Sequence, residues 1–158
     1  MDLQKRKPLR LNGYDYSRNG AYFITVCTKD KQNILGKIVG DGLCAVPKTC
    51  LSEIGFHVEK SILYMNRYHD INIDKYVLMP NHVHILISVC NQEKGKADVD
   101  ISDIIKRFKS YTTNLYGAEL WQRSYHDHII RSQQDYDEIW QYIDENPLKW
   151  VSGKNERM

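Results

Sequence analysis

The segment Tyr76–Val89 constrains the fold more than any other stretch, because a proline turn in it is followed by strand-like alternation. From His82 onward, polar or bulky residues alternate with aliphatic ones, and the period of two is typical of a β-strand. The aliphatic face consists of Val83, Ile85, Ile87 and Val89. The other face carries His82, His84, Leu86 and Ser88. Pro80 has no N–H to donate to a sheet, so it marks the boundary with a preceding strand over 71–79.

Two histidines two positions apart on a strand have neighbouring imidazole rings, which together can bind a divalent metal ion. A surface pair without a metal would show the same spacing, so His82 and His84 alone leave both interpretations open. Two imidazoles are too few ligands for Mg²⁺ or Mn²⁺, which prefer octahedral shells rich in oxygen. Water, phosphate and one further side chain would have to complete such a site.

The composition is that of an ordinary globular protein: the 158 residues suit one domain, with 42% hydrophobic and 27% charged residues. No apolar run approaches the roughly 20 residues of a membrane span, and no apolar segment follows the basic N-terminus as in a signal peptide. The cysteines lack the spacing of a zinc site, and we expect buried free thiols in a reducing cytoplasm. They are Cys27, Cys44, Cys50 and Cys90.

Positive charge is concentrated in three places, although the net charge is only +2. These are a basic, turn-rich arm over 1–20, a cluster over 106–109 and a pair of arginines over 123–131. Positively and negatively charged surfaces that simply face solvent would also explain this distribution of charge. The basic clusters nevertheless suit phosphate contacts to DNA. The candidate DNA-binding residues are Lys5, Arg6, Lys7, Arg10, Lys106, Arg107, Lys109, Arg123 and Arg131. An acidic run over 135–145 should repel phosphate unless a metal ion or the basic arms intervene.

The hydrophobic periodicity predicts the order of strands and helices. Strands are expected over 21–28, 71–79, 82–89 and 125–131, with a short hairpin formed by 34–39 and 43–46. Helices are expected over 51–64, 101–116 and 132–145, with N-caps at Thr49 or Ser52, at Ser102 and at Ser132. Pro147 should end the last helix. The order predicts one domain over 1–158 with a ferredoxin-like α+β fold, an antiparallel sheet with helices packed on one face.

Five blocks of the chain can be compared with known families by their sequence and their order: 11–28, 79–87, 105–113, 121–131 and 142–150. In sequence and in order they resemble the REP-associated tyrosine transposases. These belong to the insertion-sequence-200-like superfamily of single-tyrosine transposases with a His-hydrophobic-His (HUH) motif. The resemblance covers nearly the whole chain. It implies the same ferredoxin-like fold, with a C-terminal helix that carries the catalytic tyrosine.

The resemblance implies an enzyme that nicks and rejoins single-stranded DNA beside a hairpin. Its tyrosine would attack a phosphodiester, form a 5′-phosphotyrosine link and release a 3′-hydroxyl. A free tyrosine has a pKa of about 10, so its phenolate is scarce at neutral pH and needs help. Mg²⁺ or Mn²⁺ held by His82 and His84 would supply that help by polarising the scissile phosphate.

Two tyrosines compete for the role of nucleophile. Tyr111 lies in a basic segment but falls on the apolar stripe of its helix, so we expect it to pack in the core. Tyr142 lies about 110° from the centre of the apolar stripe of the last helix, beside the core face. Asn146 follows Tyr142 by one turn on the same flank. The resemblance places the nucleophile and an amide ligand for the metal at these two positions, although some relatives have Gln in place of Asn.

Several points stay open from the sequence. His128 could bind phosphate, orient a partner or serve the structure of its block. The site could be completed within one chain or by a partner helix in a homodimer. One alternative function is a non-catalytic nucleic-acid-binding module on a ferredoxin-like sheet. Another is a metal-dependent phosphodiesterase that uses water in place of tyrosine.

Overall fold

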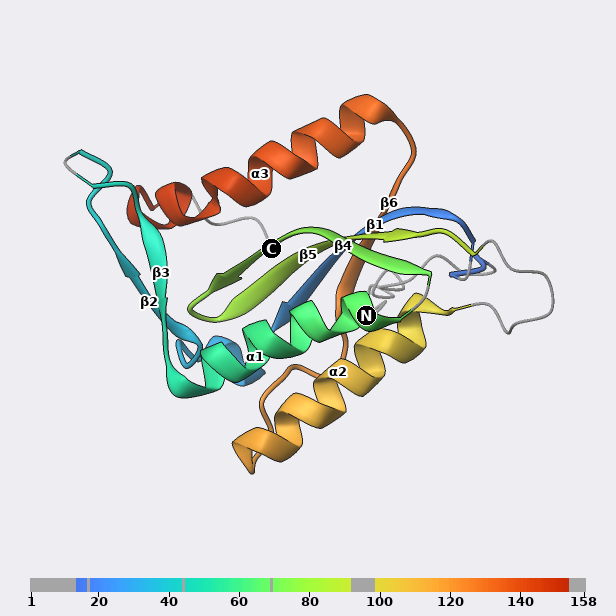
Figure 1. Cartoon of the computed structure of the whole chain (residues 1–158). Helices are drawn as coiled ribbons and strands as arrows, with labels where there is room; N and C mark the ends of the chain where they lie inside the picture. The colour runs from blue at the N-terminus through green and yellow to red at the C-terminus, as the bar shows by residue number, and fades with distance from the viewer. Residues whose placement is uncertain (1–13, 17, 44, 69, 92–98, 154–158) are drawn as a thin grey trace, which may run out of the picture.

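The computed structural model describes residues 14–16, 18–43, 45–68, 70–91 and 99–153. Its strands are β1 (Gly20–Cys27), β2 (Gly36–Val39), β3 (Lys48–Leu51), β4 (Ile71–Met79), β5 (His82–Val89) and β6 (His126–Ile130). Its helices are α1 (Glu53–Tyr64), α2 (Ile101–Tyr116) and α3 (Gln133–Val151) (Figure 1). Within these ranges no helix is long and apolar enough to cross a membrane.

Four strands form an antiparallel sheet in the order β4-β5-β1-β6, while β2 and β3 pair separately. β1 and β4 run in the same direction with β5 between them, because β5 is antiparallel to both. This connectivity is the split βαβ arrangement of ferredoxin-like folds. The predicted fold class is therefore confirmed, and the four strands of this sheet agree with the predicted ranges to within one residue.

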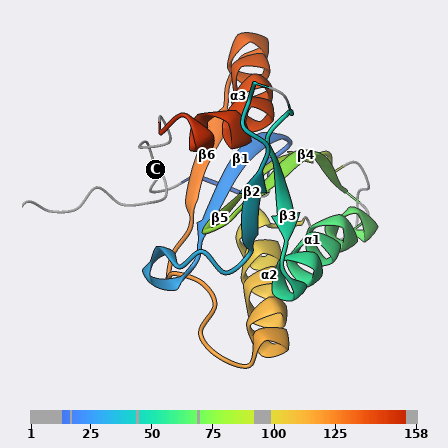
Figure 2. The ribbon, with the colours of Figure 1, turned by 90° about the vertical axis from the view of Figure 1, so that its left-hand side faces the viewer.

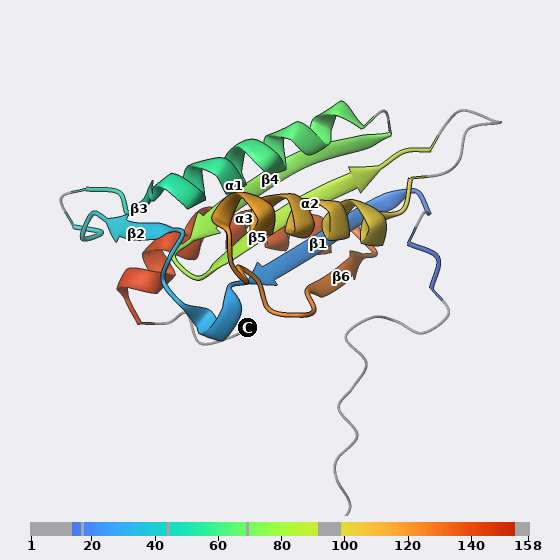
Figure 3. The same ribbon diagram turned by 90° about the horizontal axis from the view of Figure 1, so that it is seen from below.

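Different helices cover the two faces of the sheet. α1 and α2 lie on one face and α3 lies across the other (Figures 1 and 3). The aliphatic side of β5 belongs to the larger core beneath α1 and α2. On the opposite side, Leu86 of β5 packs with Ile139 and Ile143 of α3 in a smaller core. The C-terminal helix therefore covers the face of β5 that carries the histidines.

The helices begin at polar caps. Ser52 caps α1 and Ser132 caps α3, each by accepting a backbone N–H bond. α2 is capped by Asp100, whose carboxylate accepts a bond from the Ser102 N–H at 2.7 Å. The prediction of a cap at Ser102 is wrong by two residues, because this residue supplies the backbone donor and not the accepting side chain.

The β2–β3 hairpin has a longer loop than the sequence predicted. The second strand was expected over 43–46, but β3 is the segment that pairs with β2. Leu43 and Val46 are 92% and 86% exposed, so no packing holds these apolar side chains in a sheet. Gly42 turns the chain in the left-handed region, with φ +77°, before a strand could begin.

Pro147 lies inside α3, so the prediction that it ends the last helix is wrong. A proline inside a helix removes one backbone hydrogen bond and crowds the preceding turn. Here Pro147 is buried, and the end of α3 contacts both strands of the β2–β3 hairpin. Figure 2 shows this hairpin extending from α1 to the C-terminal part of α3. These contacts offset the lost bond, and the helix continues through Lys149 and Trp150.

The cysteines are only partly as expected. Cys27 is a buried free thiol, whereas Cys50 and Cys90 are free and exposed. Cys50 is exposed because β3 lies outside the four-stranded sheet, so alternate side chains of β3 face solvent. Cys90 directly follows the end of β5. Cys44 lies outside the described residues.

Candidate metal and nucleophile site

The two histidines lie at the start of β5, buried between the sheet and α3. Antiparallel pairing places His84 opposite Thr25 and His82 opposite Cys27 on β1. The two imidazole centroids are 4.6 Å apart, and the side chains are 1% and 0% exposed. The strand alternation thus brings the rings together as predicted, but in a dry environment and not on the surface.

Neighbouring oxygens orient both imidazoles in the same way. The Nδ1 of His82 lies 2.7 Å from the side-chain oxygen of Asn81, and the Nδ1 of His84 lies 2.8 Å from the Thr25 hydroxyl. An amide oxygen can only accept, so Nδ1 of His82 carries the proton and its Nε2 keeps a lone pair. Such bonds at one ring nitrogen commonly orient the other nitrogen toward a metal. Neither Nε2 has a hydrogen-bond partner among the described residues.

Both imidazoles are neutral at neutral pH. Burial lowers the pKa of His82 from 6.5 to about 4, the charge of Lys31 lowers it further, and the neighbouring Asn146 amide partly opposes this. Burial also lowers the pKa of His84 well below its usual range, and the nearby His82 acts in the same direction. A metal-binding imidazole must be unprotonated, so this environment keeps the pair ready to bind.

Asn146 brings an oxygen from α3 to the same place. Its side chain is fully buried, and its Oδ1 has no hydrogen-bond partner among the described residues. A buried amide oxygen without a partner is costly and calls for an explanation. Two imidazole nitrogens and one amide oxygen form a donor set that fits a divalent cation completed by water or phosphate. No group of three His, Cys, Asp or Glu in the described ranges could hold a metal, so a site at the two histidines would draw on other donors such as this amide.

Tyr142 is on the same helix as Asn146 and lies beside the histidines of β5. Its ring centroid is 5.3 Å from that of His84 and 6.0 Å from that of Phe23. Phe23 in turn stacks on His84 at 5.1 Å, so three rings form one wall of the site. Tyr142 is half-buried, in keeping with a position on the flank of α3 and not within its core stripe. One turn later, the Asn146 amide donates to the Tyr142 carbonyl at 3.4 Å.

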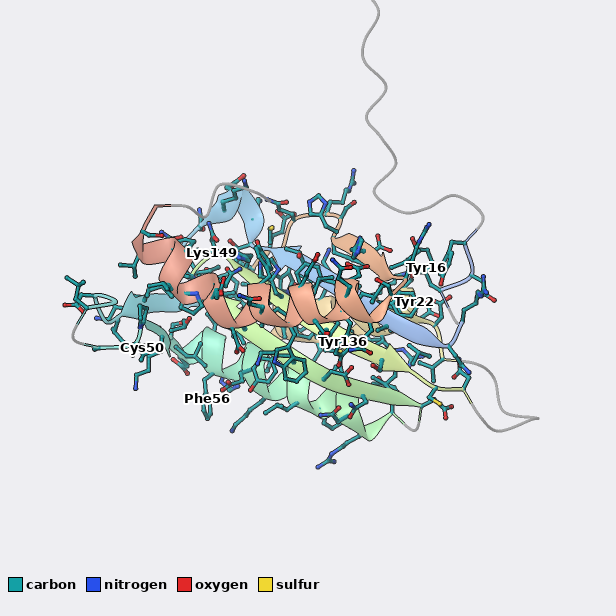
Figure 4. The ribbon with its side chains drawn as sticks, turned by 90° about the horizontal axis from the view of Figure 1, so that it is seen from above. Tyr16, Tyr22, Cys50, Phe56, Tyr136 and Lys149 are labelled. Carbon is teal, nitrogen blue, oxygen red and sulfur yellow. The ribbon has the colours of Figure 1, made fainter. Side chains whose placement is uncertain are left out.

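Two residues of α3 near this site were missed by the sequence reasoning, as were Thr25, Asn81 and Phe23. The Nζ of Lys149 lies 4.7 Å from the centroid of the Tyr142 ring, and the Trp150 ring lies 6.4 Å from that of His82. Figure 4 shows Lys149 toward the C-terminal end of α3 and Tyr136 nearer its N-terminal end. The signal was present, since Lys149 follows Tyr142 by seven residues and so returns to the same flank. It was lost because the helix was expected to end before it.

Residues 16–146 match the family described as Transposase IS200 like. The chain belongs to the IS200-like transposase family. An uncharacterized protein of Haemophilus influenzae is 31% identical over 170 residues, which cover 94% of this chain and 91% of that protein. A REP-associated tyrosine transposase of Escherichia coli K12 is 25% identical over 139 residues, covering 86% of this chain and 72% of that enzyme.

A solved structure also shares the fold of this IS200-like family member. It is a REP-associated tyrosine transposase bound to a REP hairpin, with a TM-score of 0.63 and 22% identity. The match covers 97% of this chain and 79% of that one. The resemblance to REP-associated tyrosine transposases seen in the sequence is thus confirmed, and with it the arrangement of sheet and helices.

The candidate DNA-binding residues of this IS200-like protein lie in different environments. Lys106 and Arg107 on α2, and Arg123 and Arg131, are exposed. Lys109 differs, because its Nζ donates to the Gln122 carbonyl at 2.7 Å and the Arg123 carbonyl at 3.1 Å. Its ammonium therefore joins α2 to the following segment. The remaining candidates, Lys5, Arg6, Lys7 and Arg10, lie outside the described residues.

Tyr111 does not pack in the core, contrary to the prediction from its helical stripe. It is 59% exposed, and Leu115 one turn later is 46% exposed. Both line a groove of about 500 Å³ between α1 and α2. This groove lies on the other side of the sheet from the histidines, so Tyr111 cannot reach them.

The acidic run of α3 is partly neutralised by neighbours. Among the described residues, Lys75 pairs with Asp144 at 2.6 Å and Lys149 with Glu145 at 3.6 Å, while the Nε2 of His128 lies within hydrogen-bond distance of Asp135 at 2.8 Å. His128 therefore contacts the first turn of α3, which gives it a structural partner. The two lysine pairs reduce the negative charge of α3 beside the histidine site.

Proposed function

We propose that this chain is a metal-dependent single-strand DNA endonuclease and strand transferase acting beside hairpin DNA. In this proposal Tyr142 is the nucleophile, and His82, His84 and Asn146 bind Mg²⁺ or Mn²⁺. The observation that carries it is the convergence, next to a half-buried tyrosine, of three buried nitrogen and oxygen atoms that have no hydrogen-bond partner among the described residues. Membership of the IS200-like transposase family supports the proposal, as does the shared fold with a transposase bound to a REP hairpin.

Each residue has a physical task in this reaction. When bound, the metal ion polarises the scissile phosphate and stabilises charge on its oxygens. Asn81 and Thr25 bind the Nδ1 atoms of the two imidazoles, which leaves both Nε2 atoms for the metal. Phe23 and His84 position the Tyr142 ring from the side, so its hydroxyl does not have to be ordered during attack.

The geometry supports a site completed within one chain. The histidines, Asn146 and Tyr142 all come from the same polypeptide, and α3 lies across its own sheet (Figure 1). A homodimer is therefore not required to assemble the donors. We propose that the reaction takes place in the cytoplasm, where the DNA substrate is found.

The proposal is tested by trapping the covalent intermediate. The protein is incubated with Mg²⁺ and a labelled hairpin that carries a single-stranded flank, and adducts are separated on a denaturing gel. Wild type should form an adduct whose labelled peptide contains Tyr142. Tyr142→Phe removes one hydroxyl and almost no volume, so it should fold and bind the hairpin but form neither adduct nor cut product. A chelator should abolish cutting by wild type.

The matched control is Tyr111→Phe, which should cut at the wild-type rate. An adduct peptide containing Tyr111, with Tyr142→Phe still active, would overturn the assignment of the nucleophile. Cut DNA without any covalent protein would favour the phosphodiesterase that uses water. Hairpin binding without cutting in either metal would favour the non-catalytic module.

A further inference from the structure

Lys149 places a positive charge beside the proposed nucleophile. Seven residues advance a helix by about 700°, so Lys149 lies within about 20° of Tyr142 around the axis of α3. Its Nζ is 4.7 Å from the centroid of the Tyr142 ring. Asn146, between them in sequence, directs its amide oxygen into the buried side of the same flank. The cation and the proposed metal ligands therefore both lie close to Tyr142.

The contacts of Lys149 leave its ammonium available for a ligand. Glu145 lies 3.6 Å away, well beyond the roughly 2.7–2.9 Å of a charge-assisted hydrogen bond. An ion pair of this kind on a helix surface contributes only a few tenths of a kcal/mol. The Lys149 side chain is also 33% exposed, so an incoming phosphate could reach it.

Lys75 of β4 offers an instructive comparison, because its side chain contacts the same helix, α3. Its Nζ lies 4.3 Å from the centroid of Trp140, much as Lys149 lies against Tyr142. However, Lys75 is 2.6 Å from the Asp144 carboxylate, a direct ion pair between β4 and α3. Its charge is therefore used to hold α3 on the sheet. The charge of Lys149 has no comparable structural use.

We propose that Lys149 binds the phosphate that Tyr142 attacks and offsets the negative charge on its oxygens during strand transfer. This inference rests on the proposed function. In the step, a bond forms between the Tyr142 oxygen and phosphorus, and the bond from phosphorus to the 3′ oxygen breaks. The 3′ oxygen keeps the electron pair and takes a proton from water, while the phenolic proton passes to solvent. In rejoining, a 3′-hydroxyl of DNA forms the new bond to phosphorus and loses its proton to water. The tyrosine oxygen leaves with the electron pair beside the same ammonium and takes up a proton from water.

A lysine suits this task because its compact charge sits on a flexible stem and can follow a phosphate as its geometry changes. Positioned charges of this kind act where charge develops, and removing one donor commonly slows the chemical step by about 10²-fold or more. Because Lys149 is one-third exposed, water weakens its effect, and we expect a loss of about 10- to 100-fold.

The test measures single-turnover adduct formation on hairpin DNA with Mg²⁺. Lys149→Gln should slow adduct formation by about 10- to 100-fold. Lys149→Glu should slow it further, and Lys149→Arg should retain most of the wild-type rate. Glu145→Gln should not slow the reaction, because it frees the ammonium. Lys75→Gln is the matched control and should react at the wild-type rate after its folded state is verified by circular dichroism.

A second measurement separates phosphate contact from a structural effect. In the Tyr142→Phe background, the affinity for hairpin DNA is measured against salt concentration. Each phosphate contact to a single strand contributes about 0.7 to the slope, so adding Lys149→Gln should lower the slope by about 0.7, whereas Lys75→Gln should not. If wild type forms the Tyr142 adduct while Lys149→Gln reacts equally fast with an unchanged slope, the role of Lys149 is refuted and the proposed function stands. If wild type forms no adduct, both fail together.

Discussion

Burial of the histidine pair should make the metal-free protein lose stability as the pH falls from 6.5 toward 4. The unfolded chain binds a proton at His82 below pH 6.5, whereas the folded protein does so only near pH 4. Between these values the unfolded state binds more protons, so acid favours unfolding. The stabilising contribution of the neutral imidazole is therefore fully present above pH 6.5 and is lost as the pH falls to about 4.

The magnitude follows from the two pKa values. At about 1.4 kcal/mol for each tenfold difference in proton affinity, the gap between 6.5 and about 4 amounts to about 3 kcal/mol. At pH 5 about 2 kcal/mol of this is already lost, a large part of the roughly 5–15 kcal/mol that stabilises a typical domain. His84 acts in the same direction, because burial lowers its pKa as well.

The assay is urea unfolding followed by circular dichroism at pH 7, 6 and 5, with a chelator present. His82→Gln removes the titrating group. Between pH 7 and pH 5, the free energy of unfolding of this variant should therefore fall by about 2 kcal/mol less than that of wild type. His126→Gln, which replaces an exposed histidine on β6, is the control and should follow wild type. Parallel profiles for wild type and His82→Gln would refute the claim that a buried, neutral imidazole resists protonation here.

Two other changes have defined outcomes. Mn²⁺ at 100 times its dissociation constant should stabilise wild type by about 2.7 kcal/mol in thermal unfolding. His84→Ala or Asn146→Ala should remove most of this gain. Equal stabilisation of all three proteins by Mn²⁺ would contradict the proposed set of metal ligands. Lys109→Ala should lower the free energy of unfolding by about 1–3 kcal/mol, because it removes the side-chain donor to two main-chain carbonyls. Lys106→Ala should weaken DNA binding and leave the free energy of unfolding unchanged. Equal stability of the two lysine variants would contradict the structural role of Lys109.

Local patterns in the sequence were enough for the strands of the sheet and for which side chains of β5 share a face. The alternation from His82 to Val89 depends only on the pleat of one strand, so it predicts a shared face for the histidines without knowledge of any partner. The flank position of Tyr142 likewise depends only on the helical period, and the structure places that residue half-buried beside His84. Periodicity is a property of neighbouring residues, and such properties can be read from a sequence.

Tertiary structure decided the features that depend on distant partners. The orientation of His84 depends on Thr25, which is 59 residues away in sequence, and the depth of Asn146 depends on how α3 lies on the sheet. Pro147 stays inside α3 because the β2–β3 hairpin contacts the end of that helix, and only this extension brings Lys149 to Tyr142. Tyr111 fits a core stripe by period alone, yet it is exposed because it lines an open groove between α1 and α2. Burial and contact are set by the assembled surfaces, and no local window contains that information.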